Sequence, residues 1–394
     1  MSNLPRKEEY QTYRGWLISN IFILYKESGS VSGLKAIIEA RRIIIYKNRE
    51  SYSAFPSLEI LNDGTLICAF REAVRRRFRT HIDPTSKAVI VRSLDGGHTW
   101  NPQTRTVIYE EEGCGIQDPS VRRLKDGTLI ANFFKWRVGT EDEVPQTNTR
   151  IRGLDGVHYA WTEGTYVSRS SDGGESWTRP VKVNSPCGDS TATSEPVLEL
   201  PDGTLLLPIY GQLPGDETPR SMIVRSYDKG RTWKDPSTIA YDPLGNIGFY
   251  EPALLYIPGS EKILCMMRVH RRPREEYGYY LYQSESTDLG ETWTTPRRTL
   301  MWGHPPNLTL LRDGSIICSY GYRRPPYGVR ACISTDEGKS WNIKDEIILR
   351  SDGLDGDLGY PSTVQLEDRT ILTAYYFREK DGITHIALAR YRLK

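Results

Sequence analysis

The stretch Ser93-Leu-Asp-Gly-Gly-His-Thr-Trp100 decides the fold, because its frame recurs four more times along the chain. The other copies begin at Ser170 (SSDGGESW), Ser226 (SYDKGRTW), Ser286 (STDLGETW) and Ser334 (STDEGKSW). In the shared frame Ser-x-Asp-x-Gly-x-Thr/Ser-Trp, the Asp can accept backbone N–H bonds, the Gly permits a positive φ, and the Trp can pack back between strands. Each copy is therefore predicted to be a hairpin turn.

A second repeat alternates with the first from residue 41 onward, and each copy reads as a strand, an Asp-Gly-type turn and another strand. The copies open on Phe55-Pro56, Asp118-Pro119, Glu195-Pro196, Glu251-Pro252, Pro305-Pro306 and Tyr360-Pro361. Together the two repeats give units of four strands that begin roughly 45 to 75 residues apart, which is the range of propeller blades. The sequence therefore predicts an all-β, six-bladed β-propeller with four antiparallel strands in each blade.

The sixth unit lacks the octapeptide, and the chain ends shortly after it. A strand at residues 41–46 can complete that last blade and close the ring. We expect residues 1–40 to be an N-terminal extension and residues 41–394 to be the propeller. The apolar run at 16–25 is too short to span a membrane. We interpret it as a helix or an added strand rather than a signal segment. The insertion at 138–164 is long enough to be a functional rim or lid.

The composition of the 394-residue chain fits a soluble globular protein. A net charge of +2 gives no sign of a nucleic acid or membrane partner. Cys68, Cys265 and Cys318 occupy the same place in three repeats, so they cannot pair and are predicted to be buried. The lack of a disulfide framework favours a reducing, cytoplasmic location, with secretion not excluded. No metal or nucleotide motif is present, so we expect no cofactor and no metal.

The innermost strands of a propeller converge on its axis, so the residue before each repeated Pro is expected to face one shared cavity. These residues are Phe55, Asp118, Glu195, Glu251, Pro305 (preceded by His304) and Tyr360. Crowded carboxylates raise one another's pKa, which suits general acids and bases. The alternative is that some of these carboxylates only bond neighbouring backbone and that Tyr360 is an aromatic plug.

The octapeptide frame is the Asp-box, and the chain resembles the sialidase (neuraminidase) superfamily of BNR-repeat proteins. The resemblance implies that the Asp-boxes lie on the face away from the active site. It also implies a Tyr nucleophile assisted by a Glu, an Asp acid/base from a first-blade loop, and three Arg that bind the substrate carboxylate. In this chain those roles fall on Tyr360 (in GYPST), Glu195 (in SEPVLEL) and Asp83 (in THIDP, beside His81). A neutral Tyr suits an anionic substrate, which a carboxylate nucleophile would repel.

The arginines depart from the family pattern. Ala54-Phe55-Pro56 stands where the family has Arg-Ile-Pro, and the hairpin that Glu195 begins ends at residues 207–210 (LPIY) without an Arg. Arg71, Arg268 and Arg330 lie at other plausible positions and are predicted to contact the anion.

Further substrate contacts are predicted from Asp118, Glu251 and His304. Asp355 and Asp357 precede Tyr360, and we interpret them as turn residues rather than as groups beside the Tyr.

These residues predict a sialidase-like exo-glycoside hydrolase that removes a terminal acidic sugar from a carbohydrate substrate. Two enzymatic alternatives use the same fold. One is a polysaccharide lyase in which His304 or Tyr360 abstracts a proton, and the other is an inverting hydrolase in which Asp118, Glu195 and Glu251 activate water. A third alternative is a glycan- or protein-binding propeller without catalysis.

Overall fold

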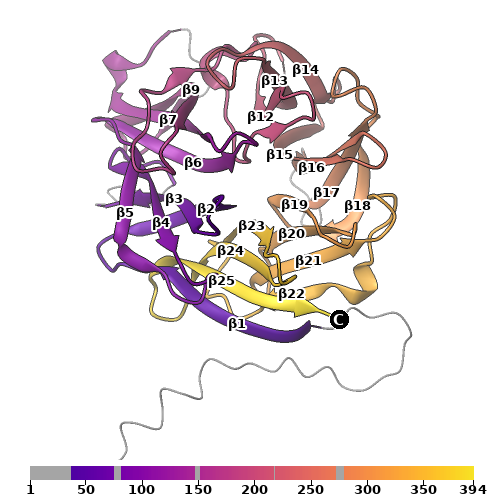
Figure 1. The fold of residues 1–394 in the computed structure, drawn as a ribbon. Coiled ribbons are helices and arrows are strands. Elements are labelled where there is room, and N and C mark those ends of the chain that lie inside the picture. Colours follow the sequence, from indigo (N-terminus) through magenta and orange to yellow (C-terminus); the bar gives the residue numbers. More distant parts are fainter. Residues whose placement is uncertain (1–36, 75–80, 147–150, 217, 272–278) are drawn as a thin grey trace, which may run out of the picture.

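The computed structural model describes residues 37–74, 81–146, 151–216, 218–271 and 279–394. Six antiparallel sheets stand around a central axis as the blades of a propeller (Figure 1). The predicted all-β, six-bladed architecture is therefore confirmed. Within these ranges no helix is long and apolar enough to cross a membrane.

The first five blades follow the chain in order. Blade 1 consists of β2 (Tyr52–Ile60), β3 (Leu66–Ala73), β4 (Ser86–Ser93) and β5 (Asn101–Tyr109). Blade 2 consists of β6 (Cys114–Arg123), β7 (Leu129–Thr140), β9 (His158–Ser170) and β10 (Val181–Lys182), with β8 (Ile151–Gly153) paired to β9. Blade 3 consists of β11 (Leu198–Glu199), β12 (Leu205–Gly211), β13 (Arg220–Ser226) and β14 (Lys234–Ala240). Blade 4 consists of β15 (Ile247–Ile257), β16 (Lys262–Arg271), β17 (Tyr280–Ser286) and β18 (Arg297–Trp302). Blade 5 consists of β19 (Pro306–Leu310), β20 (Ile316–Tyr322), β21 (Gly328–Ser334) and β22 (Ile347–Arg350).

Blade 6 joins the two ends of the described chain. It consists of β23 (Gly359–Gln365), β24 (Ile371–Arg378), β25 (Thr384–Leu393) and β1 (Ile37–Tyr46). The strand β1 pairs antiparallel with β25, and Figure 1 shows the two lying side by side. The strand predicted at 41–46 does close the ring, but it begins at Ile37, inside the segment 1–40 that was expected to be the N-terminal extension.

The octapeptides form the predicted turns and pack between blades. In the third copy, Asp228 Oδ1 accepts the backbone N–H of Thr232 at 2.9 Å and Ser226 Oγ donates to the same oxygen at 2.8 Å. The backbone N–H of Gly230 donates to Ser226 Oγ at 2.8 Å. Trp233 is buried in an apolar cluster that includes Ile130 of blade 2. Each Asp-box thus contributes both a turn and a wedge between neighbouring blades.

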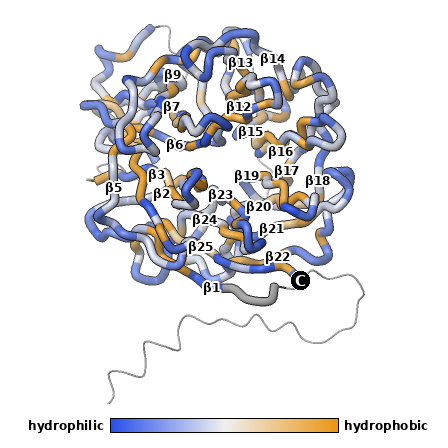
Figure 2. The backbone as a smooth tube through the Cα atoms, in the orientation of Figure 1, coloured by the Kyte–Doolittle hydropathy of each residue, from blue (hydrophilic) through white to orange (hydrophobic). Residues whose placement is uncertain are grey.

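The core lies between the blades. Figure 2 shows the hydrophobic residues concentrated in the strands and the hydrophilic residues on the turns at the periphery. Cys68, Cys265 and Cys318 lie in β3, β16 and β20, where they are buried and free, as predicted.

Four of the innermost strands share a backbone distortion that positions the site. The register of β2, β6, β15 and β23 shifts by one residue at the repeated Pro. The residue before the Pro has a left-handed φ in each case: 59° at Phe55, 47° at Asp118, 49° at Glu251 and 47° at Tyr360. A bulge of this kind re-aims a side chain, and non-glycine residues in this region are strained and cluster at functional sites.

The contact between the Asp-box that begins at Ser286 and the neighbouring blade leads to a prediction about stability. Gly290 has a φ of +86°, and a Cβ there would lie 2.8 Å from Cδ1 of the buried Ile223. Gly203 has a φ of +87° but no atom within 4 Å of such a Cβ. Gly290→Ala is therefore expected to lose about 1–2 kcal/mol more stability than Gly203→Ala, because only the first adds overpacking to the backbone strain. Thermal unfolding of the two variants checks this, and equal losses of Tm would contradict it.

Candidate functional site

Three of the four bulged strands, β6, β15 and β23, contribute residues to the wall of a cavity of about 420 Å³. This volume lies within the range of small-molecule sites. Its polar wall includes His81, Gln117, Asp118, Arg152, Ser190, Gln212, Glu251, Arg268, His270 and Tyr360. Its aromatic wall includes Phe134, Trp136, Tyr210 and Tyr250. Arg152 comes from the insertion at 138–164, so this insertion contributes to the cavity wall.

A short hydrogen bond joins two residues of the predicted ring. Tyr360 Oη donates to Glu251 Oε1 at 2.5 Å, and both side chains are buried. Burial, followed by the negative charge of Glu251, raises the pKa of Tyr360 well above its ordinary value. The phenol therefore keeps its proton in the resting site and presents it to the carboxylate.

Arg268 compensates the charge of Glu251. Its Nη1 lies 3.0 Å from Oε1 and 3.1 Å from Oε2 of Glu251, and its Nε donates to His270 Nε2 at 3.0 Å. Burial alone would raise the pKa of Glu251, but the charge of Arg268 and the hydrogen bonds from Tyr360 and Arg268 outweigh it, so the pKa lies below its usual value. Glu251 is thus a carboxylate at neutral pH that can accept the proton of Tyr360.

Asp118 also lines the cavity and titrates in a different pH range from Glu251. Its Oδ2 accepts from Ser194 Oγ at 2.8 Å and its Oδ1 accepts from Gln117 Nε2 at 3.0 Å. Burial, followed by the charge of Glu251, raises the pKa of Asp118 to about 7. At neutral pH Glu251 is therefore ionised, whereas Asp118 is in the middle of its titration.

The predicted pairing of Glu195 with Tyr360 is wrong, because Glu251 takes that place. Glu195 Oε2 accepts from Asn307 Nδ2 at 2.9 Å, and the residue does not line the cavity. The left-handed φ found at Glu251 is not found at Glu195, and the first strand of its blade, β11, begins three residues later. No bulge therefore turns Glu195 toward the axis. Burial raises its pKa to about 8, which keeps the group neutral at pH 7.

A clue to this correction was present in the sequence. The family pattern requires that the assisting Glu and the second Arg begin and end one hairpin. Glu251 in β15 and Arg268 in β16 meet this requirement, and their ion pair shows that the two residues meet in space. The local match of SEPVLEL to the family motif was the misleading signal.

Asp83 is not brought to the cavity. Its side chain is fully buried, and its Oδ1 accepts from the backbone N–H of Thr85 at 2.8 Å and from Thr85 Oγ1 at 2.6 Å. The Asp-Pro-Thr sequence forms a local turn in which the Asp side chain bonds its own backbone, as Asp side chains commonly do. The carboxylate thus supports the loop in this structure rather than lining the cavity.

Three other predicted substrate contacts also lie outside the cavity lining. The Nε of Arg71 donates to Ser86 Oγ at 2.8 Å, and its guanidinium lies over aromatic rings of blade 1. Arg330 forms an ion pair with Glu346 and lies over the ring of Tyr322. These partners direct both arginines into the blades.

His304, the third of these residues, is buried beside the ring of Tyr279, with the ring centroids 5.0 Å apart. Packing against an aromatic ring accounts for its position, and the predicted contact with substrate has no counterpart in the cavity lining.

The interpretation of Asp357 as a turn residue was incomplete. Asp357 Oδ1 accepts from Tyr52 Oη at 2.8 Å and lies 3.1 Å from Nε2 of the cavity-lining His81. Tyr376 Oη donates to the same oxygen at 3.3 Å. In the sequence His81 stands near Asp83, and no repeat or motif links it to Asp357, which lies 276 positions further along the chain. Asp355 does form the expected turn, because its Oδ1 accepts the N–H of Asp357.

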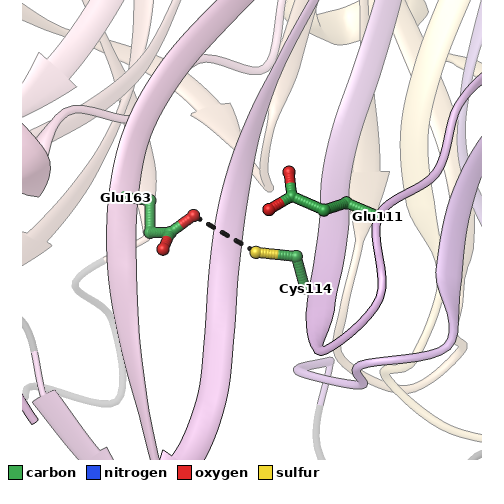
Figure 3. Close-up of side chains that lie close together, drawn as sticks. All are labelled: Glu111, Cys114 and Glu163. Carbon is green, nitrogen blue, oxygen red and sulfur yellow. Dashed lines mark hydrogen bonds between the residues drawn. The ribbon is translucent and has the colours of Figure 1, made fainter. Parts of the chain in front are cut away.

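Glu111, Cys114 and Glu163 form a cluster whose possible ligand atoms lie within 4.8 Å of one another (Figure 3). Two cations already neutralise it: Lys135 Nζ lies 2.7 Å from Glu111 and 3.1 Å from Glu163, and Arg137 pairs with both carboxylates. Burial and the charge of Glu163 raise the pKa of the Cys114 thiol, which donates to Glu163 at 3.2 Å. A protonated thiol and two compensated carboxylates do not fit a metal site.

The buried Glu195 makes the stability of the protein depend on pH. Its folded pKa of about 8 lies above the unfolded value, so the stabilisation that it contributes is complete below the unfolded pKa and is lost as pH rises toward 8. Glu195→Gln keeps an oxygen for Asn307 and cannot ionise. We expect the variant to be more stable than the parent at pH 8, by roughly 4 kcal/mol, with little difference at pH 4.5. Chemical unfolding at both pH values checks this, and a gain that does not depend on pH would contradict it.

The chain is similar to several known proteins. A sialidase of Bacteroides fragilis is 21% identical over 86% of this chain, and the chain spans 62% of that protein's length. A solved Dyadobacter fermentans protein of unknown function is 30% identical, with a TM-score of 0.79 over 90% of this chain and 99% of that one. The α-L-arabinanase of Penicillium chrysogenum, solved with arabinobiose, is 16% identical, with a TM-score of 0.63 over 89% of this chain and 97% of that one.

A family model described as "BNR repeat-like domain" matches residues 152–376, which is more than half of the chain. This match includes four of the five Asp-boxes as well as Glu251, Arg268 and Tyr360. The chain therefore belongs to the family of BNR repeat-like domain proteins.

Proposed function

We propose that the protein is an exo-acting glycoside hydrolase that removes a terminal acidic sugar, with Tyr360 as nucleophile and Glu251 as its base. The observation that carries this proposal is the 2.5 Å hydrogen bond from Tyr360 Oη to Glu251 in the wall of the cavity. A nucleophile with an adjacent base, itself held by a third group, is the arrangement that activates a weak nucleophile. Arg268 is that third group. The curated relatives named sialidases support the same reaction class.

The electrostatics of the pair suit this chemistry. Because Glu251 is ionised and Tyr360 is protonated, the proton can pass to Glu251 only as the phenol oxygen attacks. The nucleophile itself therefore carries no negative charge before the reaction. A neutral nucleophile of this kind tolerates an anionic sugar better than a carboxylate does.

The cavity also has features that favour an acidic terminal sugar. Arg152 and Arg268 both line it, and an arginine fork is well matched to a carboxylate. The remaining wall has four aromatic rings, which suit the apolar faces of a sugar. The volume of about 420 Å³ matches a site for a small ligand rather than a groove for a long chain.

A second candidate substrate is a neutral pentose. Ala54 stands where the family has its first clamp arginine, and the ring of the next residue, Phe55, packs edge-on against Tyr360 with the centroids 4.6 Å apart. An apolar edge at this place favours a sugar without a carboxylate beside its anomeric carbon. The arabinanase and the arabinofuranosidase among the structural neighbours share the fold and support this candidate.

Three variants test the proposed roles. Tyr360→Phe removes the nucleophilic oxygen and Glu251→Gln removes the base, so each is expected to lower kcat by about 10²–10⁴-fold. Glu195→Gln is the matched control, because it changes a buried carboxyl group outside the cavity and is expected to keep kcat within about threefold. The substrates are 4-nitrophenyl glycosides of N-acetylneuraminic acid, glucuronic acid, arabinofuranose and rhamnose.

The outcomes separate the hypotheses. Turnover of an acidic glycoside supports the first substrate, and turnover of the arabinofuranoside alone supports the second. Full activity of Tyr360→Phe would overturn the assigned mechanism. Binding of these sugars in calorimetry without hydrolysis of any of them would identify a binding propeller instead.

A further inference from the structure

The proposed nucleophile leaves one chemical need unmet. When the bond to the departing sugar or alcohol breaks, its oxygen requires a proton, and a later water must lose one. Glu251 is occupied with the proton of Tyr360, and Asp83 is buried, accepts from Thr85 of its own turn and does not line the cavity. Another group that can carry a proton must therefore face the substrate.

His81 lies in the same first-blade loop and lines the cavity. Its ring packs edge-on against Phe55, with the centroids 5.3 Å apart, and Phe55 in turn packs against Tyr360. The imidazole is thus one aromatic ring away from the proposed nucleophile. Its side chain is 38% exposed, so one edge remains accessible.

Asp357 fixes the orientation of this imidazole. Its Oδ1 lies 3.1 Å from His81 Nε2 and also accepts from Tyr52 and Tyr376. Burial opposes ionisation of Asp357, but its hydrogen bond with His81 and the charges of His81 and Arg323 hold its pKa well below the usual range. An ionised carboxylate can only accept, so Nε2 carries a proton and Nδ1 of the neutral ring has a free lone pair.

The Nδ1 atom is available for chemistry. In the part of the chain that the structure describes, the hydrogen bonds of His81 are confined to Nε2. Nδ1 is therefore free to meet a substrate oxygen or a water. This is the arrangement of a general acid/base: one nitrogen held by a carboxylate and the other facing the cavity.

The other titratable groups of the cavity are committed elsewhere. His270 Nε2 accepts from Arg268, and its ring packs against Tyr250. Both oxygens of Asp118 accept hydrogen bonds from neighbouring side chains. His81 is the cavity group whose remaining nitrogen has no such commitment among the described residues.

We propose that His81, oriented by Asp357, is the acid/base residue of this site. The inference rests on the proposed function and assigns the proton transfer that Tyr360 and Glu251 do not perform. It makes His81 a catalytic residue and Asp357 a positioning residue.

The two half-reactions balance as follows. In the first, Tyr360 Oη bonds to the anomeric carbon and its proton goes to Glu251. The bond to the leaving oxygen breaks with its electron pair on that oxygen, which takes the proton from Nδ1 of protonated His81. In the second, water attacks the anomeric carbon and gives a proton to Nδ1. The bond to Tyr360 breaks, and the phenol recovers its proton from Glu251.

The surroundings of His81 set the pH at which it works. The groups that face it are Asp357, Arg71, Arg323 and, through Asp357, the hydroxyls of Tyr52 and Tyr376. Burial lowers the pKa of His81, and the charges of Arg71 and Arg323 lower it further. The hydrogen bond with Asp357 and the charge of Asp357 raise it, but the pKa of His81 still lies below its usual value. Only the protonated ring can donate to a leaving group, so kcat/KM for a poor leaving group should fall as pH rises through this lowered pKa.

The leaving group provides the experiment. Phenyl and 2,4-dinitrophenyl glycosides are compared, made with N-acetylneuraminic acid and with arabinofuranose, because phenol needs a proton on departure and dinitrophenolate does not. His81→Gln keeps an amide that can donate to Asp357. We expect it to lower kcat/KM about 10²–10³-fold for the phenyl glycoside and less than 10-fold for the dinitrophenyl glycoside. The alkaline fall in kcat/KM seen for the phenyl glycoside should be absent for the dinitrophenyl glycoside.

Matched variants complete the test. Asp357→Asn is expected to show the same selectivity with a smaller loss, and Asp83→Asn to show no difference between the two leaving groups. The selective pattern in Asp83→Asn, or an equal loss for both leaving groups in a His81→Gln protein with parental Tm, would overturn the role of His81. If either of these outcomes is found while Tyr360→Phe is inactive, only the role of His81 is overturned and the proposed function stands. An active Tyr360→Phe would overturn the proposed function. A protein that turns over no glycoside would overturn both the proposed function and the role of His81.

Discussion

The site depends on one backbone constraint, which is the left-handed residue before proline in four of the innermost strands. An extended strand would point these side chains along the sheet face, whereas the bulge turns them toward the axis. Glu251 and Tyr360 come from blades 4 and 6, and the bulges bring their oxygens to 2.5 Å across the cavity. Each such residue costs of order 1–3 kcal/mol of strain, which the packed blades must offset. The Asp-boxes and the closing pair β1–β25 hold those blades together, so the Asp-boxes support the site without lining the cavity.

Burial raises the pKa of each carboxyl group that this scaffold collects, and the neighbouring groups decide the net direction. Burial and the neighbouring Glu251 raise the pKa of Asp118 to about 7, whereas Arg268 and Tyr360 overcome the same burial at Glu251 and lower its pKa. A cationic neighbour thus decides which carboxyl group is ionised. The same principle applies at the cavity edge, where hydrogen bonding with His81 and its charge lower the pKa of Asp357 against its burial. The site therefore has one anion beside the phenol and another behind the imidazole.

The sequence was informative wherever a repeat fixed the geometry. The octapeptides and the Asp-Gly hairpins predicted six blades, and the cavity residues Asp118, Glu251 and Tyr360 were found by their equivalent places before a proline. Phe55 shares their left-handed φ but does not line the cavity. The same argument failed at Glu195, because nothing in the sequence shows that its strand lacks the bulge. Equivalence in sequence thus locates an inner strand but does not guarantee the backbone conformation that turns its first side chain inward.

Contacts between loops of distant blades were beyond this reasoning. His81 and Asp357 are separated by 276 residues and belong to no repeat, so only the closed ring brings them together. Arg71 and Arg330 seemed suitable for an anion, but Ser86 and Glu346 hold them inside their own blades. Side-chain partners of this kind follow from packing rather than from spacing.

The central claim is that the phenol of Tyr360 attacks the sugar. The most direct measurement is to trap the intermediate with fluorinated glycosyl fluorides, using 2,3-difluoro-N-acetylneuraminic acid and 2-deoxy-2-fluoro-arabinofuranosyl fluoride, and to map the labelled peptide by mass spectrometry. The account predicts a covalent glycosyl adduct on Tyr360 that is absent from Tyr360→Phe. An adduct on Glu251 or Asp118 would contradict it, as would hydrolysis of these reagents without any covalent label on the protein.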